Sequence, residues 1–585
     1  MCLRRSQTPV SSYSRPSAGT EHRLNGARQG PAGSGAPVKT LSSGFLSNSL
    51  IGLDRSALVA VTVLALAVRF HGITLPAIWY DEAFSVLLAR HEPWHIWSIT
   101  ARDVHPPLYY LVLHYWMILF GDGALAVRSL SVIADVGTVL LSIKLMSLVA
   151  TRRATWMAAL LLALLPISVR YSQEARMYTL LGFWLMGATV ALVCWVKDPE
   201  KKRFPIIYVL LMTAAFYTHY FAALCVLVHW FYWWWGRPGK YQTVLPVRSW
   251  MLVNGLIVML FLPWLPHFTD QLYARYVLNW IPPITMQALL SLVWQFILMN
   301  GWQAQSLLVC ALPLIGVASC AAMLVWNDKA QLRFSGLLAS YFFIPTVILA
   351  LVALVIPMFV PRYLVFAAVG MPFVVAVALD RLARRPEVLV LAGMIVLAAE
   401  VLGLQSVHRQ EDGLNGTDLR RDFRLDVLAA KLQEAVRPGD EIVLESLIWY
   451  LPFSYYNQTG IRPKLYIRLP PSTALEVFDR SGYALISEGS KWVYFNNPQV
   501  LKCHGNRGWW VAAKPLSDIR PLLEKDWENT LTLRDGAMVA SLFTLKTSPA
   551  PDEAGNPVTI TQPPPPAAQN CPPAPSATSA NKMPH

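Results

Sequence analysis

The sequence predicts an α-helical polytopic membrane protein with about eleven transmembrane helices, additional interfacial helices and a small exterior α/β domain. The prediction rests on the composition, on a series of long apolar runs, and on the uneven distribution of basic residues between them. Of the 585 residues, 55% are hydrophobic and only 14% are charged, and the mean hydropathy is +0.40. Soluble globular domains carry about 25% charged residues, so the composition argues against a single soluble domain.

The apolar runs define the predicted membrane spans. A helix needs about 20 predominantly apolar residues to cross a bilayer. Suitable runs cover residues 53–70, 124–149, 154–171, 177–196, 204–218, 221–236, 249–266, 305–326, 334–356, 362–380 and 387–404. Residues 204–236 are too many for one span, and we divide them near Thr218-His219-Tyr220.

The basic residues orient these spans. With a cytoplasmic N-terminus, 14 basic and four acidic side chains lie in the inner connections, which are residues 150–153, 197–203, 236–248, 327–333 and 380–386. Cytoplasmic loops of membrane proteins are enriched in Lys and Arg, so this distribution supports the span count and places the C-terminal region outside. The net charge of +14 is therefore an orientation signal and does not indicate nucleic acid as a partner.

Two further apolar segments, residues 107–120 and 284–300, are predicted to be helices in the exterior interface. As full spans they would invert the loops that follow them and place the arginines outside. Helices with one apolar face can lie at the boundary between headgroups and acyl chains, a place that suits Trp116 and Trp294.

The remaining segments flank a transmembrane domain of residues 51–404. Residues 1–50 are predicted to be a disordered cytoplasmic tail, and residues 548–585 a disordered Pro/Ala-rich tail. Residues 405–547 are predicted to form the exterior, periplasmic α/β domain. Its expected elements are a helix at 419–436 and strands at 441–445, 464–468, 483–486, 492–495 and 508–512.

Ionisable residues collect on the exterior side of this topology. Acidic and basic groups at membrane depth are costly and usually mark functional sites. Carboxylates beside arginines at one interface suit a substrate that carries an anionic phosphate. The relevant motifs are Asp81-Glu82 and Asp103-Val104-His105-Pro106-Pro107-Leu108 after the first span, Gln173-Glu174-Ala175-Arg176 after the third, and Arg362-Tyr363 at the start of the tenth.

Each of these residues also has a simpler explanation. The alternatives are a solvated helix start for Asp81 and Glu82, a loop residue for His105, headgroup anchors for Arg170, Arg176 and Arg362, and a helix cap for His219. Asp135 and Lys144, both inside a span, could form a packed polar contact and no site.

Taken in order, the motifs resemble the polytopic glycosyltransferase C superfamily, whose members use lipid-linked sugar phosphates. More narrowly, the chain is similar to bacterial members related to the protein O-mannosyltransferases, the lipid A aminoarabinose transferases and the lipid A galacturonosyltransferases. The resemblance runs from about residue 50 to residue 460. It rests on Asp81-Glu82, His105-Pro-Pro-Leu, Gln173-Glu174-Ala-Arg176 and Pro361-Arg362-Tyr363, which occur in the order found in the family.

The resemblance implies an inverting transfer of a sugar from a polyprenyl-phosphate donor. Asp81, in the first-loop Asp-Glu motif, would be the catalytic base that deprotonates the acceptor hydroxyl. Glu82 would support the loop or the acceptor. Glu174 occupies the position of a second acid, in the second exterior loop.

The resemblance also assigns residues to the donor phosphate. His105 stands where the aminoarabinose transferases have a phosphate-contacting lysine, and Arg362 matches an arginine expected near that phosphate. A guanidinium suits a phosphate leaving group because it stabilises the developing charge. Tyr363, Arg176 and His219 are further candidates for binding the donor phosphate or the substrate.

A divalent metal is the one cofactor that the resemblance raises. Val104 occupies the position of an acid that helps to hold a metal in the aminoarabinose transferases, and this departure puts the metal in doubt. Asp103 could substitute for that acid, with His105 as a second ligand.

We therefore expect a glycosyltransferase of the bacterial inner (plasma) membrane, with its active site on the exterior, periplasmic face. Its partners would be a polyprenyl-phosphate sugar donor, membrane lipids, and an envelope lipid, glycan or protein as acceptor. The alternative is a flippase or transporter of polyprenyl phosphate or a lipid-linked sugar. A third function, acceptor binding by a protein with an inactive site, is disfavoured by the intact set of acids.

Overall fold

The structure of the protein, a computed structural model, describes most of the chain outside its two ends. The described residues are 43–236, 244–273, 281–299, 306–330, 332–382, 385–412, 420–466, 481–487, 494–495, 507–513, 523 and 527–546. The chain divides into two compact units, Met1–Arg55 and Ser56–His585. The predicted tails lie largely outside the described residues, although helix α1 (Ser43–Phe70) begins within residues 1–50.

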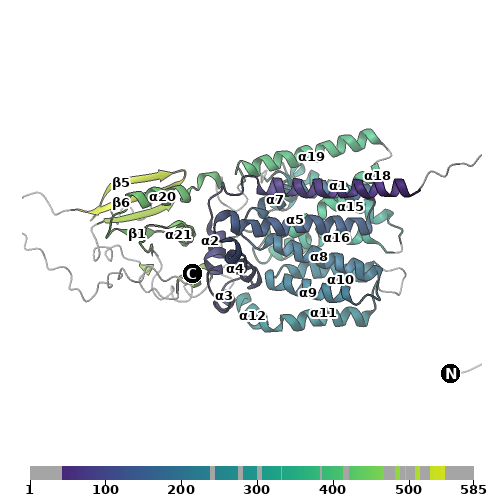
Figure 1. Ribbon diagram of the computed structural model, residues 1–585, viewed down its shortest axis with the longest axis horizontal. Coiled ribbons are helices and arrows are strands. Elements are labelled where there is room, and N and C mark those ends of the chain that lie inside the picture. The colour runs from purple at the N-terminus through teal and green to yellow at the C-terminus, as the bar shows by residue number, and fades with distance from the viewer. Residues whose placement is uncertain are drawn as a thin grey trace, which may run out of the picture. The chain divides into compact units, whose positions relative to one another are not determined.

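Long apolar helices lie side by side and form the larger part of the second unit (Figure 1). The unbroken ones are α5 (Ala124–Val149), α8 (Tyr178–Lys197), α9 (Arg203–Thr218), α10 (Ala222–Trp235), α15 (Leu307–Asn327), α16 (Phe334–Ala353) and α19 (Pro386–His408). Helix α11 (Val247–Phe261) continues through a 3-10 turn, η1 (Leu262–Trp264), into α12 (Leu265–Tyr273).

Two further spans are bent at a break. Helix α6 (Arg152–Leu164) meets α7 (Pro166–Ser172) at 51°, and the second bend measures 42°. The second bent span consists of the 3-10 helix η3 (Pro361–Leu364), α17 (Val365–Ala368) and α18 (Gly370–Leu382). Both breaks leave a short helical piece, and these two pieces carry Arg170 and Arg362.

Every predicted span coincides with a helix or with one of these bent pairs, so the predicted positions are confirmed. By length and composition, six helices can cross a membrane, or up to eight if each bent pair is one span. Helices α9 and α10 are apolar but shorter. The gap between them at His219 confirms the division of residues 204–236, whereas the total of eleven stays a prediction.

Arg69 of α1 supplies the hydrogen bonds that are lost where α6 breaks. Pro166 has no amide hydrogen, so the carbonyl of Leu162 cannot receive its usual helical bond. The Arg69 guanidinium donates to the carbonyls of Leu162 at 3.3 Å and Ala163 at 2.7 Å. It also pairs with Asp135 at 2.7 Å, with both side chains buried. Asp135 thus makes a packed polar contact, as one of the sequence alternatives proposed, but its partner is Arg69, and Lys144 is exposed.

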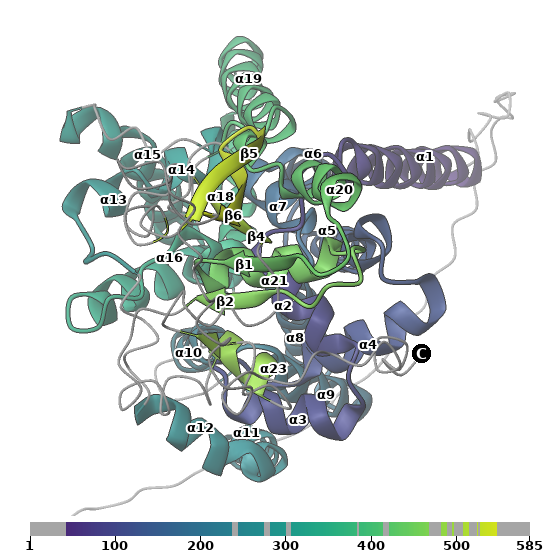
Figure 2. The same ribbon diagram turned by 90° about the vertical axis from the view of Figure 1, so that its left-hand side faces the viewer.

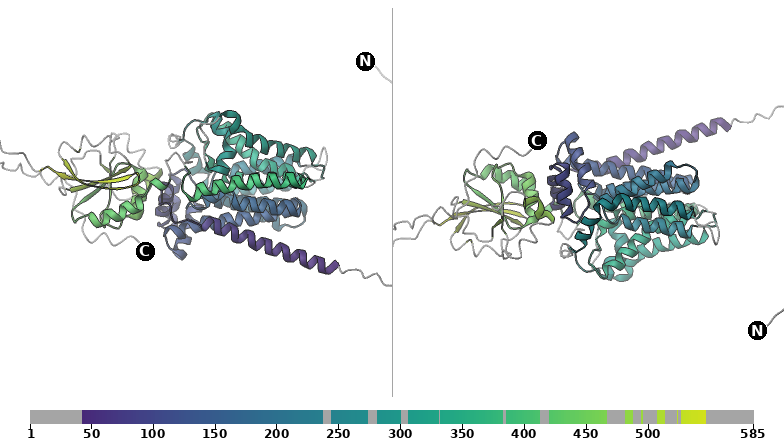
Figure 3. Two further views of the ribbon diagram at one scale, coloured as in Figure 1. Left: turned by 90° about the horizontal axis from the view of Figure 1, so that it is seen from above. Right: turned by 90° about the horizontal axis from the view of Figure 1, so that it is seen from below.

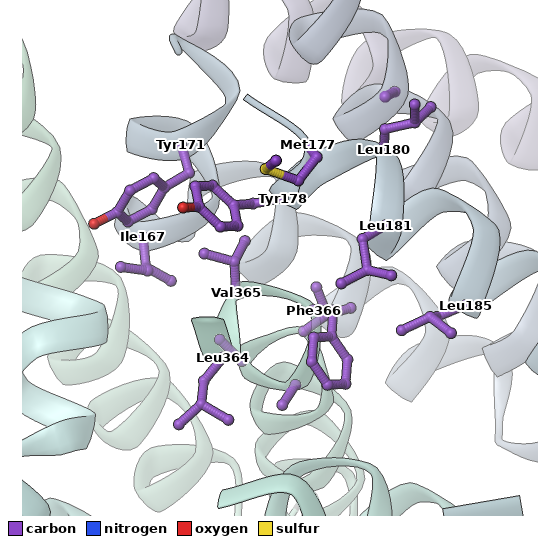
Figure 4. Close-up of a cluster of buried hydrophobic side chains, with 14 of the residues drawn as sticks. Ile167, Tyr171, Met177, Tyr178, Leu180, Leu181, Leu185, Leu364, Val365 and Phe366 are labelled. Carbon is purple, nitrogen blue, oxygen red and sulfur yellow. The ribbon is translucent and has the colours of Figure 1, made fainter. Parts of the chain in front are cut away.

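An apolar cluster holds the two bent spans against α8 (Figure 4). Ile167 and Tyr171 come from α7, and Leu364, Val365 and Phe366 come from the short piece formed by η3 and α17. They pack with residues at the start of α8, namely Met177, Tyr178, Leu180, Leu181 and Leu185. Because the cluster is buried, the short piece that carries Arg362 is fixed relative to the loop before α8.

Short helices gather at one end of the long ones (Figures 1 and 2). They are α2 (Tyr80–Ala89), α3 (Pro93–Ala101) and α4 (Leu108–Phe120). Helix α4 matches the predicted interfacial segment 107–120, and its last residues Ile118, Leu119 and Phe120 are exposed. Helices α13 (Met286–Leu290) and α14 (Leu292–Leu298) match the segment 284–300. The helices are confirmed, and their place at a membrane surface stays a prediction.

The C-terminal region forms a six-stranded mixed sheet with two helices beside it (Figure 3). The strands, in the order β3-β2-β1-β4-β6-β5, are β1 (Glu441–Leu444), β2 (Lys464–Tyr466), β3 (Tyr494–Phe495), β4 (Arg507–Ala513), β5 (Trp527–Asp535) and β6 (Met538–Leu545). Strands β3, β2, β1 and β4 are parallel, and β6 and β5 are antiparallel. The helices are α20 (Leu425–Ala435) and α21 (Leu447–Tyr456), and α20 follows a 3-10 turn, η4 (Arg420–Asp422).

The predicted α/β character of this domain is confirmed, with one wrong element. Residues 483–486 were expected to form a strand but lie in η5 (Ser481–Tyr483) and α23 (Ala484–Ser487). So short an apolar run has no period that separates strand from helix. The hairpin of β5 and β6 was not predicted, although Asp535-Gly536 is a common hairpin turn and Gly536 has a φ of 53°.

Gly403 allows α19 to lie against the backbone of α14. A Cβ atom added at Gly403 would lie 1.7 Å from the carbonyl oxygen of Ile297 and 2.8 Å from a ring carbon of Pro166. One added at Gly393, in the same helix, would meet no heavy atom within 4 Å. Since a backbone carbonyl cannot rotate away as a side chain can, only the first position requires glycine.

Replacing this glycine should therefore weaken the bundle. We expect Gly403→Ala to lower the free energy of unfolding by about 1–3 kcal/mol, the usual cost of overpacking, and Gly393→Ala to have little effect. Thermal unfolding of the two purified variants in one detergent would compare them. Equal melting temperatures would show that α14 and α19 do not approach in this way.

Candidate active site

The first turn of α2 presents two carboxylates to different surroundings. Asp81 and Glu82 are adjacent, and adjacent residues on an α-helix point about 100° apart. The side chain of Asp81 is 16% exposed, whereas that of Glu82 is only 1% exposed. The Asp-Glu motif therefore has one reachable and one enclosed acid.

Glu82 forms a two-pronged ion pair with Arg128 of α5. Its Oε1 and Oε2 accept hydrogen bonds from Arg128 Nε and Nη2, each at 2.7 Å. Oε1 also accepts a bond from the backbone N–H of Ala175 at 2.9 Å. A buried carboxylate needs such compensation, because burial removes its hydration. Glu82 thus joins α2, α5 and the loop before α8.

Arg128 also holds the segment that leads into α2. Its Nη1 donates to the carbonyls of Ile73 at 2.7 Å and Pro76 at 2.9 Å, and its Nη2 reaches that of Ala77 at 3.3 Å. Guanidinium groups suit this task because their donors have a fixed planar arrangement. The start of α2, and with it Asp81, is therefore anchored to α5.

The loop of residues 173–177 is fixed by its own side chains as well. Gln173 donates to the carbonyls of Arg69 and His71, each at 2.9 Å. Arg176 donates to the carbonyl of Asp81 at 3.3 Å and to the Ser85 hydroxyl at 3.2 Å. The loop of residues 173–177 is thus tied to the end of α1 and to the first turn of α2.

Two arginines meet at the Asp81 carboxylate. Arg362 Nη1 lies 3.2 Å from Asp81 Oδ2, and Arg176 Nε lies 3.9 Å from the same oxygen. The arginine side chains are only 6% and 4% exposed, respectively. Arg362 also lies over the ring of Trp79, 5.8 Å from its centroid. Residues far apart in the sequence thus form one compact group of charges.

This group of charges keeps Asp81 ionised. Burial favours the neutral acid and by itself would raise the pKa of Asp81, but Arg176, Arg362 and His105 oppose it and hold the pKa below its ordinary value of 3.8. Nearby positive charge stabilises a carboxylate in this way. The arginines therefore suppress proton uptake by Asp81 near neutral pH.

Histidines and tyrosines continue this group. His105 Nδ1 lies 3.3 Å from Asp103 Oδ2, and the His105 ring is 5.5 Å from that of His219. The His219 ring lies in turn 5.8 Å from that of Tyr363. His219 Nδ1 accepts the backbone N–H of Phe221 at 3.1 Å, and His219 is also the C-terminal cap residue of α9.

Glu174 belongs to a separate buried ion network. Arg170 Nη1 lies 2.6 Å from Glu174 Oε1, and Arg170 Nε bonds to Asp412, beyond the end of α19. Asp412 also accepts two bonds from Arg420, at 2.8 and 2.6 Å. The network links the loop of residues 173–177 to the segment that enters the C-terminal domain.

Seven of the nine predicted site residues therefore form one neighbourhood: Asp81, Asp103, His105, Arg176, His219, Arg362 and Tyr363. Glu82 and Glu174 point into ion networks beside it. Sequence reasoning missed Arg128, Asp412 and Arg420. An arginine inside an apolar run was a usable signal for Arg128, because such a residue must find a buried partner.

The predicted metal ligands do not form a complete metal site. Asp103 and His105 contact each other. Among the residues that the structure describes, no group of three or more His, Cys, Asp and Glu side chains could hold a metal ion. A metal at this pair would therefore need further ligands from a substrate or from water.

The C-terminal domain contacts the segments on both sides of the short helices. Tyr456 Oη accepts the backbone N–H of Ile78 at 2.7 Å, and Tyr455 Oη donates to the carbonyl of Asp122 at 3.0 Å. Both tyrosines lie at the end of α21. The domain thus helps to hold the segment that leads into Asp81.

Breaking the Glu82–Arg128 pair should destabilise the protein strongly. We expect Glu82→Gln to cost about 3–5 kcal/mol, since it leaves a buried guanidinium without its counter-charge. Asp122→Asn is the matched control: its pair with Arg90 has side chains 51% and 34% exposed and should contribute less than about 1 kcal/mol. Melting temperatures in detergent would show the difference. If Glu82→Gln unfolded at the wild-type temperature, the ion pair would not be holding the loops.

Comparison with known proteins gives matches among solved structures. No protein-family model and no curated protein matches the sequence. The crystal structure of ArnT from Cupriavidus metallidurans in the apo state, a lipid A aminoarabinose transferase, is 13% identical; the match covers 84% of this chain and 98% of that chain, with a TM-score of 0.56. The crystal structure of the same protein bound to undecaprenyl phosphate is also 13% identical. That match covers 83% of this chain and 97% of that chain, with a TM-score of 0.56.

A weaker likeness is to the archaeal oligosaccharyltransferase AglB from Archaeoglobus fulgidus in complex with an inhibitory peptide and a dolichol-phosphate. The identity is 12% over 86% of this chain and 75% of that chain, with a TM-score of 0.47. At 13% identity the likeness to ArnT establishes the fold. The chain therefore has the fold of ArnT, in keeping with the resemblance to the lipid A aminoarabinose transferases that its ordered motifs had predicted.

Proposed function

We propose that the protein is an integral membrane glycosyltransferase that moves a sugar from a polyprenyl-phosphate donor to an exterior acceptor with inversion. The observation that carries this proposal is the partly exposed Asp81 carboxylate beside two buried guanidinium groups, Arg176 and Arg362. A transfer of this kind needs a base for the acceptor and positive charge for the leaving phosphate, and the site has both.

In the proposed reaction, Asp81 acts as the base. An acceptor hydroxyl attacks the anomeric carbon of the sugar from the face opposite the phosphate, and its proton passes to Asp81. The new bond joins the acceptor oxygen to the anomeric carbon, and the bond from that carbon to the phosphate oxygen breaks. The electron pair stays on the phosphate, and the configuration at the anomeric carbon inverts.

Arg362 and Arg176 would stabilise the charge that develops on the leaving phosphate. Their burial strengthens such an interaction, because a protein interior screens charge less than water does. His105, His219 and Tyr363 would complete the binding site for the donor or the substrate. Asp103 would orient His105 through their contact at 3.3 Å. Glu82 and Glu174 would keep the two exterior loops in place.

The likeness to ArnT supports a lipid-phosphate donor, because one of the matching structures is bound to undecaprenyl phosphate. We propose the bacterial inner membrane as the location, with the site on the periplasmic face, since the inner connections are rich in Lys and Arg. The acceptor would be an envelope lipid, glycan or protein.

Removing the base should abolish transfer without unfolding the protein. We expect Asp81→Asn to reduce transfer from a radiolabelled polyprenyl-phosphate sugar by at least about 10²-fold, within the range that general bases contribute. Asp122→Asn, also at the exterior end but outside the proposed site, should transfer at the wild-type rate. The assay uses purified protein in detergent with an envelope extract as acceptor, and gel filtration confirms folding.

Wild-type transfer by Asp81→Asn would remove Asp81 as the base. The flippase alternative gives a different result: labelled lipid would redistribute across the membrane of reconstituted vesicles while its sugar linkage stayed intact. Inversion is checked separately by the configuration of the new glycosidic bond.

A further inference from the structure

The Asp81 carboxylate contacts the two guanidinium groups that a donor phosphate would need. Arg362 Nη1 lies 3.2 Å from Asp81 Oδ2, and Arg176 Nε lies 3.9 Å from it. Both arginines are nearly fully buried, so water does not readily replace Asp81 at the guanidinium groups. An anion that binds these guanidinium groups must share them with Asp81 or displace it.

Carboxylate and phosphate are similar ligands for arginine. Both accept paired hydrogen bonds from the planar guanidinium. Two anions at one pair of arginines also repel each other, and a phosphate carries at least one negative charge. Arg362 and Asp81 are joined by a single contact at 3.2 Å, whereas the Glu82–Arg128 pair beside them has two contacts at 2.7 Å. The Asp81 contact has the less favourable geometry and is the easier one to exchange.

Two further hydrogen-bond donors lie near this contact. The Trp79 indole N–H and the Tyr110 hydroxyl are buried and have no hydrogen-bond partner among the described parts of the chain. The Trp79 ring lies beneath the Arg362 guanidinium, and Tyr110 is close enough to Arg176 and Asp81 for their charges to influence it. Buried donors are rarely left unpaired in proteins. A ligand with several acceptor oxygens would satisfy them, whereas the Asp81 carboxylate does not.

Resting on the proposed function, we infer that Asp81 and the phosphate of the lipid-linked donor compete for Arg362 and Arg176. In the free protein the arginines hold Asp81. When the donor phosphate binds, the two guanidinium groups bond to the phosphate in place of Asp81. The Asp81 carboxylate then becomes available to the acceptor hydroxyl. The base is thus released only when a donor is present.

This exchange has a consequence for binding that is independent of catalysis. Asp81→Asn removes the competing charge and leaves the arginines in place, so it should bind undecaprenyl phosphate more tightly than the wild type. A hydrogen bond to a charged group is worth about 1.5–3 kcal/mol, which corresponds to a gain of at least about tenfold in affinity. A variant expected to be inactive would therefore be the better binder.

The test measures the affinity for radiolabelled undecaprenyl phosphate. The label distributes between empty detergent micelles and micelles that contain the protein, and the fraction in the second kind is determined. Wild type, Asp81→Asn and Asp81→Ser are compared, the serine variant guarding against a folding defect specific to asparagine. Asp122→Asn removes an exposed carboxylate at the same end of the bundle and should leave the affinity unchanged. This control separates competition from a general change in surface charge.

A double-mutant cycle identifies the shared ligand. In an Arg362→Gln background, Asp81→Asn should increase the affinity for undecaprenyl phosphate much less than it does in the wild type. The guanidinium for which the two anions compete is then absent. If the increase in affinity were as large in this background, Asp81 would only repel the phosphate electrostatically. Competition for Arg362 would then be overturned.

Unchanged or weaker binding by Asp81→Asn would also overturn the inference. If the wild type still transferred sugar, the proposed function would stand and only the exchange would fall. If neither the wild type nor Asp81→Asn bound undecaprenyl phosphate, the proposed donor site and the exchange would fall together.

Discussion

The buried pair of Glu82 and Arg128 is the interaction on which the candidate site depends. It joins the first turn of α2, the span α5 and the backbone of Ala175 in a single set of hydrogen bonds. Arg128 has further donors and uses them on the carbonyls that precede α2. A carboxylate and a guanidinium buried together are stable only when nearly all their bonds are made. This requirement fixes the position of the neighbouring Asp81 and leaves it little freedom to drift from the arginines.

The broken helices are the second condition for the site. Backbone that leaves helical geometry at membrane depth is tolerated only where protein groups satisfy it. At Pro166 the Arg69 guanidinium does so, and the apolar cluster around Phe366 and Tyr178 encloses the other break. Each bent span has a short piece that carries one arginine. Arg170 pairs there with Glu174 and Asp412, and Arg362 reaches Asp81 of α2.

Much of this arrangement could be predicted from sequence, and the exceptions have physical causes. Apolar length located the spans, and the ordered motifs located Asp81, His105, Arg176 and Arg362. Arg128 was missed although it lies inside an apolar run, because the run shows that a buried partner is needed but not that this partner is Glu82. The role of Asp412 depends on a contact with Arg170, which is far away in the sequence and which no periodicity records. Residues 483–486 were assigned to the wrong element because so short a run fits either.

The two tyrosines at the end of α21 affect whether the C-terminal domain can be exchanged as a separate module. Tyr456 receives the amide of Ile78, and Tyr455 donates to the carbonyl of Asp122. If the C-terminal domain were cut away, one backbone group before α2 and one after α4 would lose these partners, and α2 would lose part of its support. A chimera that exchanges this domain for a relative's, in order to change the acceptor, would have to keep both hydroxyl groups at the junction. The domain therefore helps to hold the segment that positions Asp81.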